Sequence, residues 1–234
     1  MFKIYSFKEV SSTMDAVKSF PVNTILVAKS QTDGRGKQNS VWVSDESENL
    51  YMSISMNPNS VPGNYSNFVF LISLVVVKTL KGLIKTDFDI KIKWPNDILV
   101  NGRKVCGILL ELDKQKNSLI IGVGLNIDKH PEFLKNSKFK ATDLKSEGFL
   151  VTRDAVVREF ERTLTLYMAR IFYVGFYMVR EEWLKYAYNL GKTITVKIND
   201  STEITGIFEG LDTTGELILN KDGERFYIDT GDVF

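Results

Sequence analysis

The 234-residue sequence has one cysteine, one histidine and almost no net charge. Cys106 has no second cysteine with which to form an internal disulfide, so we expect a reducing, cytoplasmic environment. His130 precedes Pro131 in a polar stretch and is expected in an exposed loop, which excludes a Ser/His/Asp triad unless this residue serves it. The sequence also has no cluster of cysteines and histidines with the spacing of a zinc site.

Long hydrophobic runs and an excess of one charge are missing as well. The formal net charge of +1 gives no global field that would attract nucleic acid or an anionic membrane. The most apolar window, residues 68–77, is too short to span a bilayer, and the N-terminus lacks an apolar core of signal-peptide length. A hydrophobic content of 44% with 25% charged residues is ordinary for a soluble globular protein.

The order of predicted elements indicates a mixed α/β domain followed by a small β module. Helices are predicted at residues 11–20, 67–85 and about 152–179, with a shorter one at 180–189. Segments rich in β-forming residues predict strands at 24–30, 49–56, 89–94, 97–100, 104–112 and 118–127.

After Gly191 the pattern changes to short alternating strands separated by "DTTG" and "KDG" turns. Four or five such strands in the remaining residues predict a small barrel. We therefore expect two domains, residues 1–188 and residues 189–234. The barrel could be an interaction module or a lid packed on the first domain.

The stretch "KWPNDILVNGRKVCG" at 93–107 is the most informative part of the sequence. Pro95 removes a backbone donor and favours an extended conformation at Trp94, so the polar residues around it cannot share one helix. They are expected at a strand end, where polar groups can converge on a ligand. These residues are Lys93, Asn96 and Asp97. A turn held together by Asn and Asp side chains is the alternative interpretation.

A second polar segment, "QTDGRGKQNSVW", follows the strand predicted at 24–30. Glycines at 34 and 36 bracket Arg35, and glycines let backbone N–H groups approach an anion closely while arginine supplies fixed positive charge. The segment is neither a dinucleotide fingerprint nor a Walker P-loop. A flexible surface loop with two basic residues is the alternative.

Four segments occur in a fixed order: "SST" at 11–13, "GRGK…W" at 34–42, "KWPND…GRKVCGIL" at 93–109 and "IGVGLNI" at 121–127. Together they resemble the biotin protein ligases, also called biotin–[biotin carboxyl carrier protein] ligases. The residues after Gly191 are similar to this family's C-terminal SH3-like barrel, so the resemblance covers nearly the whole chain. It implies an α+β fold in which a mixed-sheet catalytic domain, related to class II aminoacyl-tRNA synthetases, precedes the barrel.

The resemblance implies ATP-dependent attachment of biotin to a lysine of a biotin carboxyl carrier domain. Biotin's carboxylate would attack the α-phosphate of Mg-ATP to give biotinyl-5′-AMP and pyrophosphate, and the carrier lysine would then attack this mixed anhydride. Because two anions must be brought together, positioned cations matter more than a histidine base. ATP, Mg²⁺ and the substrate biotin are the expected ligands.

The residues at family positions for biotin binding are Ser12, Thr13, Gln31, Gly34, Arg35, Lys104 and Gly107. By resemblance, Ser12 and Thr13 would bind the biotin ring beside Gln31. Capping of the first helix is the alternative interpretation, and the two roles can coexist. Lys104 would contact biotin's carboxylate and the α-phosphate, with an exposed lysine after an Asn-Gly turn as the alternative. Glycines at 107, 122 and 124 would let the backbone approach the ligand.

The residues at family positions for ATP binding are Arg35, Lys37, Trp42, Lys93, Asn96, Asp97 and Asn126. The catalytic set implied by the resemblance is Lys104, Lys37 and Arg35. Trp42 would pack near the adenine, although a tryptophan is more often part of a core, and Asn126 would read the adenine edge. Asp97 is a candidate Mg²⁺ ligand, held with water and phosphate oxygens.

The loop departs from the family pattern at Lys37, Asn39 and Ser40, where arginine, glycine and arginine are usual. Lysine keeps the charge but loses bidentate phosphate geometry, so we hypothesise that the loop holds the adenylate less tightly than in arginine-bearing relatives. Met14, where asparagine is common, is expected to affect packing alone.

Two other functions fit parts of this pattern. A lipoate or octanoate ligase would share the fold and the adenylating chemistry, and a non-catalytic biotin-binding protein would share the fold. The expected partner is a biotin carboxyl carrier domain docked through strand edges, which could also form a homodimer. Because the "SST" segment begins at residue 11, we expect no N-terminal DNA-binding domain, and neither a nucleic-acid nor a membrane partner.

Overall fold

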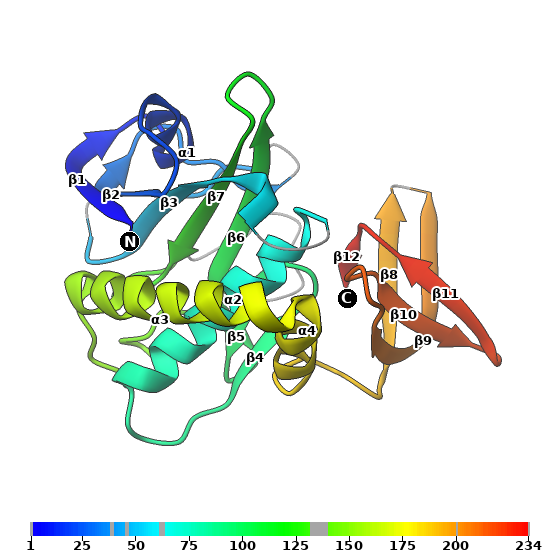
Figure 1. The fold of residues 1–234 in the computed structure, drawn as a ribbon. Helices are drawn as coiled ribbons and strands as arrows, with labels where there is room; N and C mark the ends of the chain where they lie inside the picture. The colour runs from blue at the N-terminus through cyan, green and yellow to red at the C-terminus, as the bar shows by residue number, and fades with distance from the viewer. Residues whose placement is uncertain are drawn as a thin grey trace.

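The computed structural model describes residues 2–37, 40–44, 47–60, 64–131, 140–199 and 201–233. Two separate sheets organise these residues, with strand orders β1-β2-β3-β7-β6-β5-β4 and β11-β10-β9-β8-β12 (Figure 1). The first sheet consists of β1 (Lys3–Val10), β2 (Thr24–Gln31), β3 (Leu50–Met56), β4 (Ile90–Lys93), β5 (Asp97–Val100), β6 (Arg103–Asp113) and β7 (Ser118–Leu125).

The first sheet is mixed, because β1 pairs with β2 in parallel while the other neighbouring strands are antiparallel. Its helices are α1 (Thr13–Ala16), α2 (Asn67–Leu83), α3 (Arg153–Val174) and α4 (Phe176–Leu184), with 3₁₀ turns η1 (Val17–Ser19) and η3 (Pro58–Ser60). The two long helices α2 and α3 cross the same face of this sheet (Figure 1). The α+β prediction is confirmed.

Burial explains why α2 lies between the sheet and α3. Apolar residues occupy most of its faces, and from Phe68 to Val77 every residue except Val69 is buried. Where a hydroxyl enters this core it has a partner: Ser73 Oγ accepts a hydrogen bond of 3.0 Å from the indole Nε1 of Trp183 in α4. The core therefore fixes α4, which leads into the barrel.

The second sheet follows α4 and contains β8 (Thr193–Asn199), β9 (Thr202–Leu211), β10 (Leu217–Lys221), β11 (Glu224–Ile228) and β12 (Asp232–Val233). The linker joins the first sheet like an added strand, because Ile92 N donates to Tyr186 O at 2.7 Å and Tyr188 N donates to Ile92 O at 2.8 Å. β12 lies on the side of the barrel that faces the first sheet (Figure 1). The boundary at residue 188 stays a prediction.

Two elements differ from the sequence prediction. β1 was not expected, because most side chains of "KIYSFKEV" are exposed and its stability comes from parallel pairing with β2. The predicted change of helix at 179–180 is wrong, because α3 ends at Gly175, whose φ of 77° breaks the helix. The "NGRK" turn is as predicted, with positive φ at Asn101 and Gly102.

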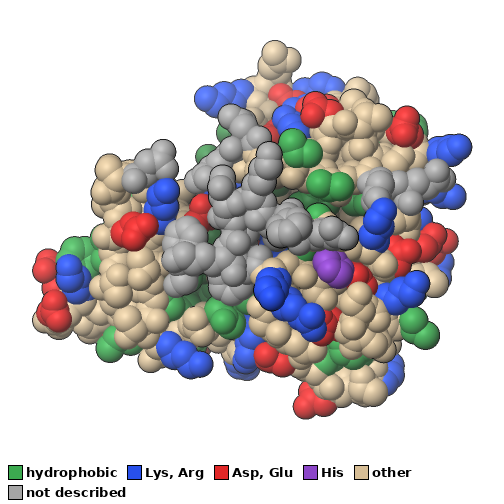
Figure 2. All heavy atoms as spheres, turned by 180° about the vertical axis from the view of Figure 1, so that it is seen from behind, with side chains coloured by type: hydrophobic (Ala, Val, Ile, Leu, Met, Phe, Trp, Pro, Cys, Tyr) green, Lys and Arg blue, Asp and Glu red, His purple; other side chains and the backbone are tan. Residues whose placement is uncertain are grey.

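The surface agrees with the balanced composition. On the face shown in Figure 2, basic and acidic side chains are interspersed rather than gathered into one large field of either sign. Within the described ranges, no helix is both long and apolar enough to cross a membrane.

Candidate functional site

The start of α1 carries the first group of predicted site residues. Thr13 donates two hydrogen bonds to Gln31 Oε1, one from its backbone N at 2.8 Å and one from its Oγ1 at 2.9 Å. Ser12 is 1% exposed, and its Oγ has no hydrogen-bond partner among the described residues. The capping alternative is wrong, because neither hydroxyl caps α1 and Gln31 accepts from its first N–H instead. A buried hydroxyl without a partner is a position from which a bound polar group can be recognised.

Trp42 covers the predicted site glycines. Gly107 of β6 and Gly124 of β7 face each other in the antiparallel pair, which leaves a patch without side chains. A Cβ added to Gly124 would lie 2.3 Å from Trp42 Cε2, and one added to Gly107 would lie 2.8 Å from Trp42 Cζ3. The indole therefore rests directly on the sheet backbone, and only glycine at these positions permits that contact.

Met14 packs against the backbone of Gly122 in the same way. A Cβ added to Gly122 would lie 2.9 Å from Met14 Sδ, and Met14 itself is buried. The departure at Met14 is thus a packing contact, with its thioether filling the space above β7. Trp42 and Met14 together cover this stretch of the sheet.

Lys104 belongs to a partly buried charge cluster rather than to an exposed turn. Its Nζ lies 2.6 Å from Asp97 Oδ1, and its side chain is 20% exposed. The same ammonium lies 5.7 Å from the centre of the Trp42 ring. The exposed-lysine alternative is therefore wrong, and the β5–β6 pairing brings together a cation and a carboxylate that the sequence separates by a hairpin.

Lys93 lies on the other side of Asp97, with 3.9 Å between its Nζ and Asp97 Oδ2. Burial lowers the pKa of Lys93 from its usual value of 10.5, and the neighbouring ammonium of Lys104 lowers it further, against the opposite effect of Asp97. Two ammonium groups, those of Lys93 and Lys104, share the single carboxylate of Asp97. The excess positive charge in this partly buried region favours binding of an anion.

The lowered pKa of Lys93 predicts how the binding of an anion depends on pH. Lys93 loses its charge as pH rises through its lowered pKa. The affinity for pyrophosphate is therefore expected to weaken at a pH below the pKa of an ordinary lysine. Calorimetric titration with pyrophosphate from about pH 7 to about pH 10 measures this. Lys93→Arg should move the loss of affinity to higher pH than in wild type, and an unchanged profile in this variant would contradict the assignment.

The two predicted asparagines are tied to the backbone. Asn96 Nδ2 donates to Ile108 O at 2.7 Å, and Asn126 Nδ2 donates to Thr142 O at 3.0 Å. For Asn96 this is the turn-holding contact of the alternative interpretation. Their roles at the phosphates and at the adenine stay predictions, for which the side-chain oxygens remain as acceptors.

Arg35 is held by two carboxylates, those of Asp15 and Glu111. Its Nη2 lies 3.0 Å from Asp15 Oδ1 and 3.2 Å from Glu111 Oε2, while its Nε is buried without a partner in the described residues. These contacts therefore do not bring Arg35 to Lys104. They anchor the start of the loop to α1 and β6.

Lys37 reaches the barrel. Its Nζ donates to Gly231 O at 2.9 Å and to Asp232 Oδ1 at 3.2 Å, and its carbonyl accepts from Ser40 Oγ at 2.7 Å. Asn39, the third departure from the family pattern, lies outside the described residues. Asp232 was missed from the sequence, because nothing in "GDVF" indicates a partner almost two hundred positions away.

A protein-built Mg²⁺ site does not fit these residues. Asp97, the candidate ligand, is flanked by Lys93 and Lys104, whose charges oppose a divalent cation. Within the described part of the chain, no group of three or more His, Cys, Asp or Glu side chains could hold a metal. A magnesium ion in this chemistry would arrive with the nucleotide phosphates.

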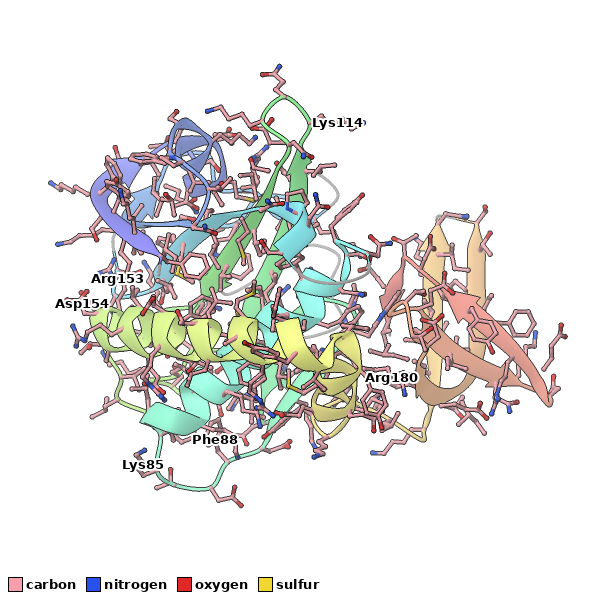
Figure 3. The ribbon with its side chains drawn as sticks, in the orientation of Figure 1. Lys85, Phe88, Lys114, Arg153, Asp154 and Arg180 are labelled. Carbon is pink, nitrogen blue, oxygen red and sulfur yellow. The ribbon has the colours of Figure 1, made fainter. Side chains whose placement is uncertain are left out.

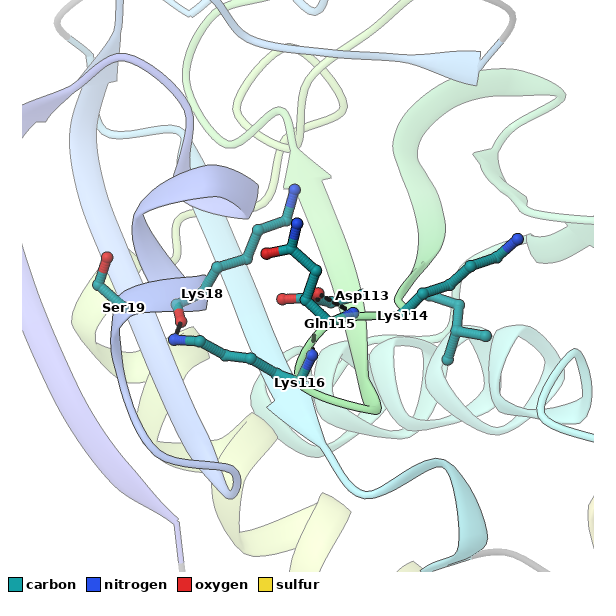
Figure 4. A pocket seen from close by; sticks show the side chains of 7 residues that line it. Lys18, Ser19, Asp113, Lys114, Gln115 and Lys116 are labelled. Atoms are coloured by element: carbon teal, nitrogen blue, oxygen red, sulfur yellow. Dashed lines mark hydrogen bonds between the residues drawn. The ribbon is translucent and has the colours of Figure 1, made fainter.

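A separate hollow of about 460 Å³ lies at the β6–β7 hairpin (Figure 4). It is lined by Lys18, Ser19 and residues 112–116, and no predicted site residue is among them. The predicted site is instead the region where α1, the loop before β3, the β4–β5 turn and β12 meet over β6 and β7.

Comparison with known proteins gives matches over both sheets. The sequence model of the biotin/lipoate A/B protein ligase family matches residues 6–128, and that of the biotin protein ligase C-terminal domain matches residues 190–234. The structure of the biotin protein ligase from Aquifex aeolicus in complex with biotin and ATP gives a TM-score of 0.86 at 25% identity, covering 100% of this chain and 98% of that one.

Two relatives show the extent of sequence similarity. The bifunctional ligase/repressor BirA of Bacillus subtilis is 33% identical over 208 residues, which cover 85% of this chain and 62% of that protein. The biotin–[acetyl-CoA-carboxylase] ligase of Paracoccus denitrificans is 28% identical over 215 residues, covering 89% of each. The chain thus spans less than two thirds of the length of the Bacillus relative and most of the length of the Paracoccus one.

Proposed function

The chain belongs to the biotin/lipoate A/B protein ligase family, and from this premise we propose that it attaches biotin to a lysine of a carboxyl carrier domain at the expense of ATP. The proposal rests on the Lys104–Asp97 pair, 2.6 Å apart, which lies beside Trp42 where the indole covers Gly107 and Gly124. This arrangement places an ammonium and an aromatic surface within one small region. These are the groups that an acyl-adenylate requires.

The proposed reaction has two steps. An oxygen of biotin's carboxylate attacks the α-phosphorus of ATP, the bond to the bridging oxygen breaks, and pyrophosphate leaves. The amine of the carrier lysine then attacks the acyl carbon of biotinyl-5′-AMP, AMP leaves with the bonding electrons, and the amine loses a proton to form the amide. Lys104 would approach both the carboxylate and the α-phosphate and stabilise the charge that develops between them.

Before ATP binds, Asp97 balances the charge of Lys104. An arriving phosphate would compete with this carboxylate for the ammonium, so Asp97 would hold Lys104 in place without blocking it permanently. Lys93, destabilised as a cation by burial, would gain a counter-charge at the same moment. Mg²⁺, as a companion of ATP, would neutralise the departing pyrophosphate.

The match at the C-terminal residues favours biotin over lipoate as the substrate. The family shared by residues 6–128 includes ligases for both, whereas the match at 190–234 is to a domain of biotin protein ligases. The Aquifex protein, whose structure contains biotin and ATP, is alike over the full length of this chain. A lipoate or octanoate ligase remains the second candidate, and a non-catalytic biotin-binding protein the third.

The carrier domain is proposed to dock on the edge of β6. The pairing of β5 with β6 ends at Gly107, and one further hydrogen bond joins Ile108 to Asn96. From Leu109 to Asp113, no described strand lies on that side of β6, so the edge is open to an added strand. Pairing of two such edges would give a homodimer instead. The cytoplasmic location, where ATP and carrier proteins are available, stays a prediction.

Mass spectrometry of a purified carrier domain tests the activity. Incubation with the full chain, biotin and Mg-ATP is expected to add one biotinyl group, and a carrier whose acceptor lysine is replaced by arginine should stay unmodified. Addition of lipoate in place of biotin would support the second candidate. Absence of any modification would support the third.

The loop hypothesis gives a further prediction. Lys37→Arg should keep the contact with Asp232 and add bidentate phosphate geometry, so biotinyl-5′-AMP is expected to leave the enzyme several-fold more slowly. Rapid dilution of the loaded enzyme, followed by measurement of released intermediate, gives the rate. Equal rates for wild type and variant would reject the hypothesis, and Lys29→Arg, on exposed β2 surface, is the control.

A further inference from the structure

A chain of side-chain hydrogen bonds begins on β3 and runs through the predicted ring-binding residues. Ser53 Oγ donates to Thr13 Oγ1 at 2.8 Å, and Thr13 Oγ1 donates in turn to Gln31 Oε1 at 2.9 Å. Ser53 and Thr13 are buried. The hydroxyl proton of Thr13 is therefore committed to Gln31, and its orientation depends on how the Gln31 amide is placed.

The chain continues from Gln31 to the loop that carries Trp42. Gln31 Nε2 donates to Ser44 Oγ at 2.8 Å, and Ser44 Oγ donates to Trp42 O at 2.9 Å. Ser44 is 8% exposed, and its own carbonyl accepts from Gln31 N at 3.1 Å. Ser44 thus joins the residue that orients Thr13 to the residue that covers the glycine patch.

The direction of every bond in this chain is fixed. The backbone N–H of Thr13 can only donate, so the oxygen of the Gln31 amide has to face α1 and its NH₂ group has to face Ser44. Ser44 has one hydroxyl proton, which it gives to Trp42, and it accepts from Gln31 with a lone pair. A residue without a hydroxyl at this position would break both links at once.

Gly34 shows how closely the loop is fitted around Ser44. A Cβ added to Gly34 would lie 2.7 Å from Ser44 Oγ and 2.3 Å from Trp42 O. The absent side chain at residue 34 leaves the space that the hydroxyl and the carbonyl occupy. The packing of the loop and the hydrogen-bond chain therefore require each other.

We propose that Ser44 is a positioning residue that couples the ring-binding end of the site, at Thr13 and Gln31, to the seat of Trp42. A ligand bound at Thr13 would hold the Gln31 amide in place, and Ser44 would transmit that order to Trp42 over Gly107 and Gly124. Biotin binding would in this way prepare the surface on which the nucleotide part of the adenylate rests. This inference rests on the proposed function for the identity of the ligand.

Ser44→Ala tests the coupling through the fluorescence of Trp42. The other two tryptophans, Trp94 and Trp183, are 3% and 0% exposed, so quenching by acrylamide reports mainly on Trp42. In Ser44→Ala, quenching is expected to increase several-fold without any ligand, and biotin affinity to fall by about tenfold. Ser44→Thr, which keeps the hydroxyl, is expected to restore most of both properties.

The matched control is Ser55→Ala. Ser55 is a buried serine two residues from Ser53 on the same face of β3, and it is outside the chain of hydrogen bonds to Trp42. It is expected to behave like wild type in quenching and in biotin affinity. Wild-type quenching in Ser44→Ala, or equal losses in Ser44→Ala and Ser55→Ala, would overturn the proposal. Failure of wild type to bind biotin would count against the proposed function instead, because the quenching comparison needs no ligand.

Discussion

Lys104→Ala is expected to reduce biotin-dependent exchange of pyrophosphate into ATP by on the order of a thousandfold. The substitution removes the ammonium that lies 2.6 Å from Asp97 and beside the Trp42 ring, and no other described cation has both contacts. Lys93 remains near Asp97, so the carboxylate is not left without a partner. The fold is therefore expected to persist, with an unchanged far-ultraviolet circular dichroism spectrum.

Two further variants separate charge from geometry at this position. Lys104→Arg keeps the charge but replaces a compact ammonium by a planar guanidinium, and its activity is expected to lie between those of wild type and Lys104→Ala. Lys114→Ala removes a lysine at the tip of the β6–β7 hairpin, far from the site, and should leave exchange unchanged (Figure 3). Near-normal exchange in Lys104→Ala would remove this residue from the reaction.

Gly124→Val is the second variant with a large expected effect. Because a Cβ at this position would lie 2.3 Å from Trp42 Cε2, the indole has to leave its seat on β6 and β7. Gly124 is not among the glycines with positive φ, and valine suits a strand, so the sheet itself is expected to tolerate the change. Affinity for a non-reactive ATP analogue in the presence of biotin is expected to fall more than tenfold, as measured by calorimetry.

The control for Gly124→Val is a glycine whose added Cβ meets a flexible side chain. At Gly82 in α2 a Cβ would lie 2.8 Å from Glu159 Oε1, which can move, and the position is remote from the site. Gly82→Ala is expected to bind the ATP analogue like wild type. If Gly124→Val also binds the analogue normally, Trp42 has no part in nucleotide binding.

Local patterns in the sequence predicted much of the fold. The strand end at "KWPND", the Asn-Gly hairpin and the alternating strands after Gly191 depend on neighbouring residues and occur as expected. β1 escaped prediction because pairing with β2, rather than its own mostly exposed side chains, holds it in the sheet. The helix break at Gly175 could have been predicted, since an isolated glycine in a helical pattern is a possible C-cap.

The site was harder to predict because its contacts join distant positions. The sequence identified Lys104 and Asp97 separately, but only the β5–β6 pairing makes them partners. Asp232 and Ser44 belong to no recognisable sequence motif. Asp232 was missed because its partner, Lys37, is distant in the sequence, and Ser44 because its hydrogen bond to Gln31 forms only in the folded chain. The glycines at 107 and 124 were predicted to admit a ligand, whereas in the structure they admit Trp42.

Biotin-dependent exchange of radiolabelled pyrophosphate into ATP by the full chain is the most direct measure of the proposed adenylation, because it requires no carrier protein. Exchange is expected with biotin, none without it, and none with lipoate in its place. Exchange that requires lipoate, or no exchange with either acid, would contradict the proposed function.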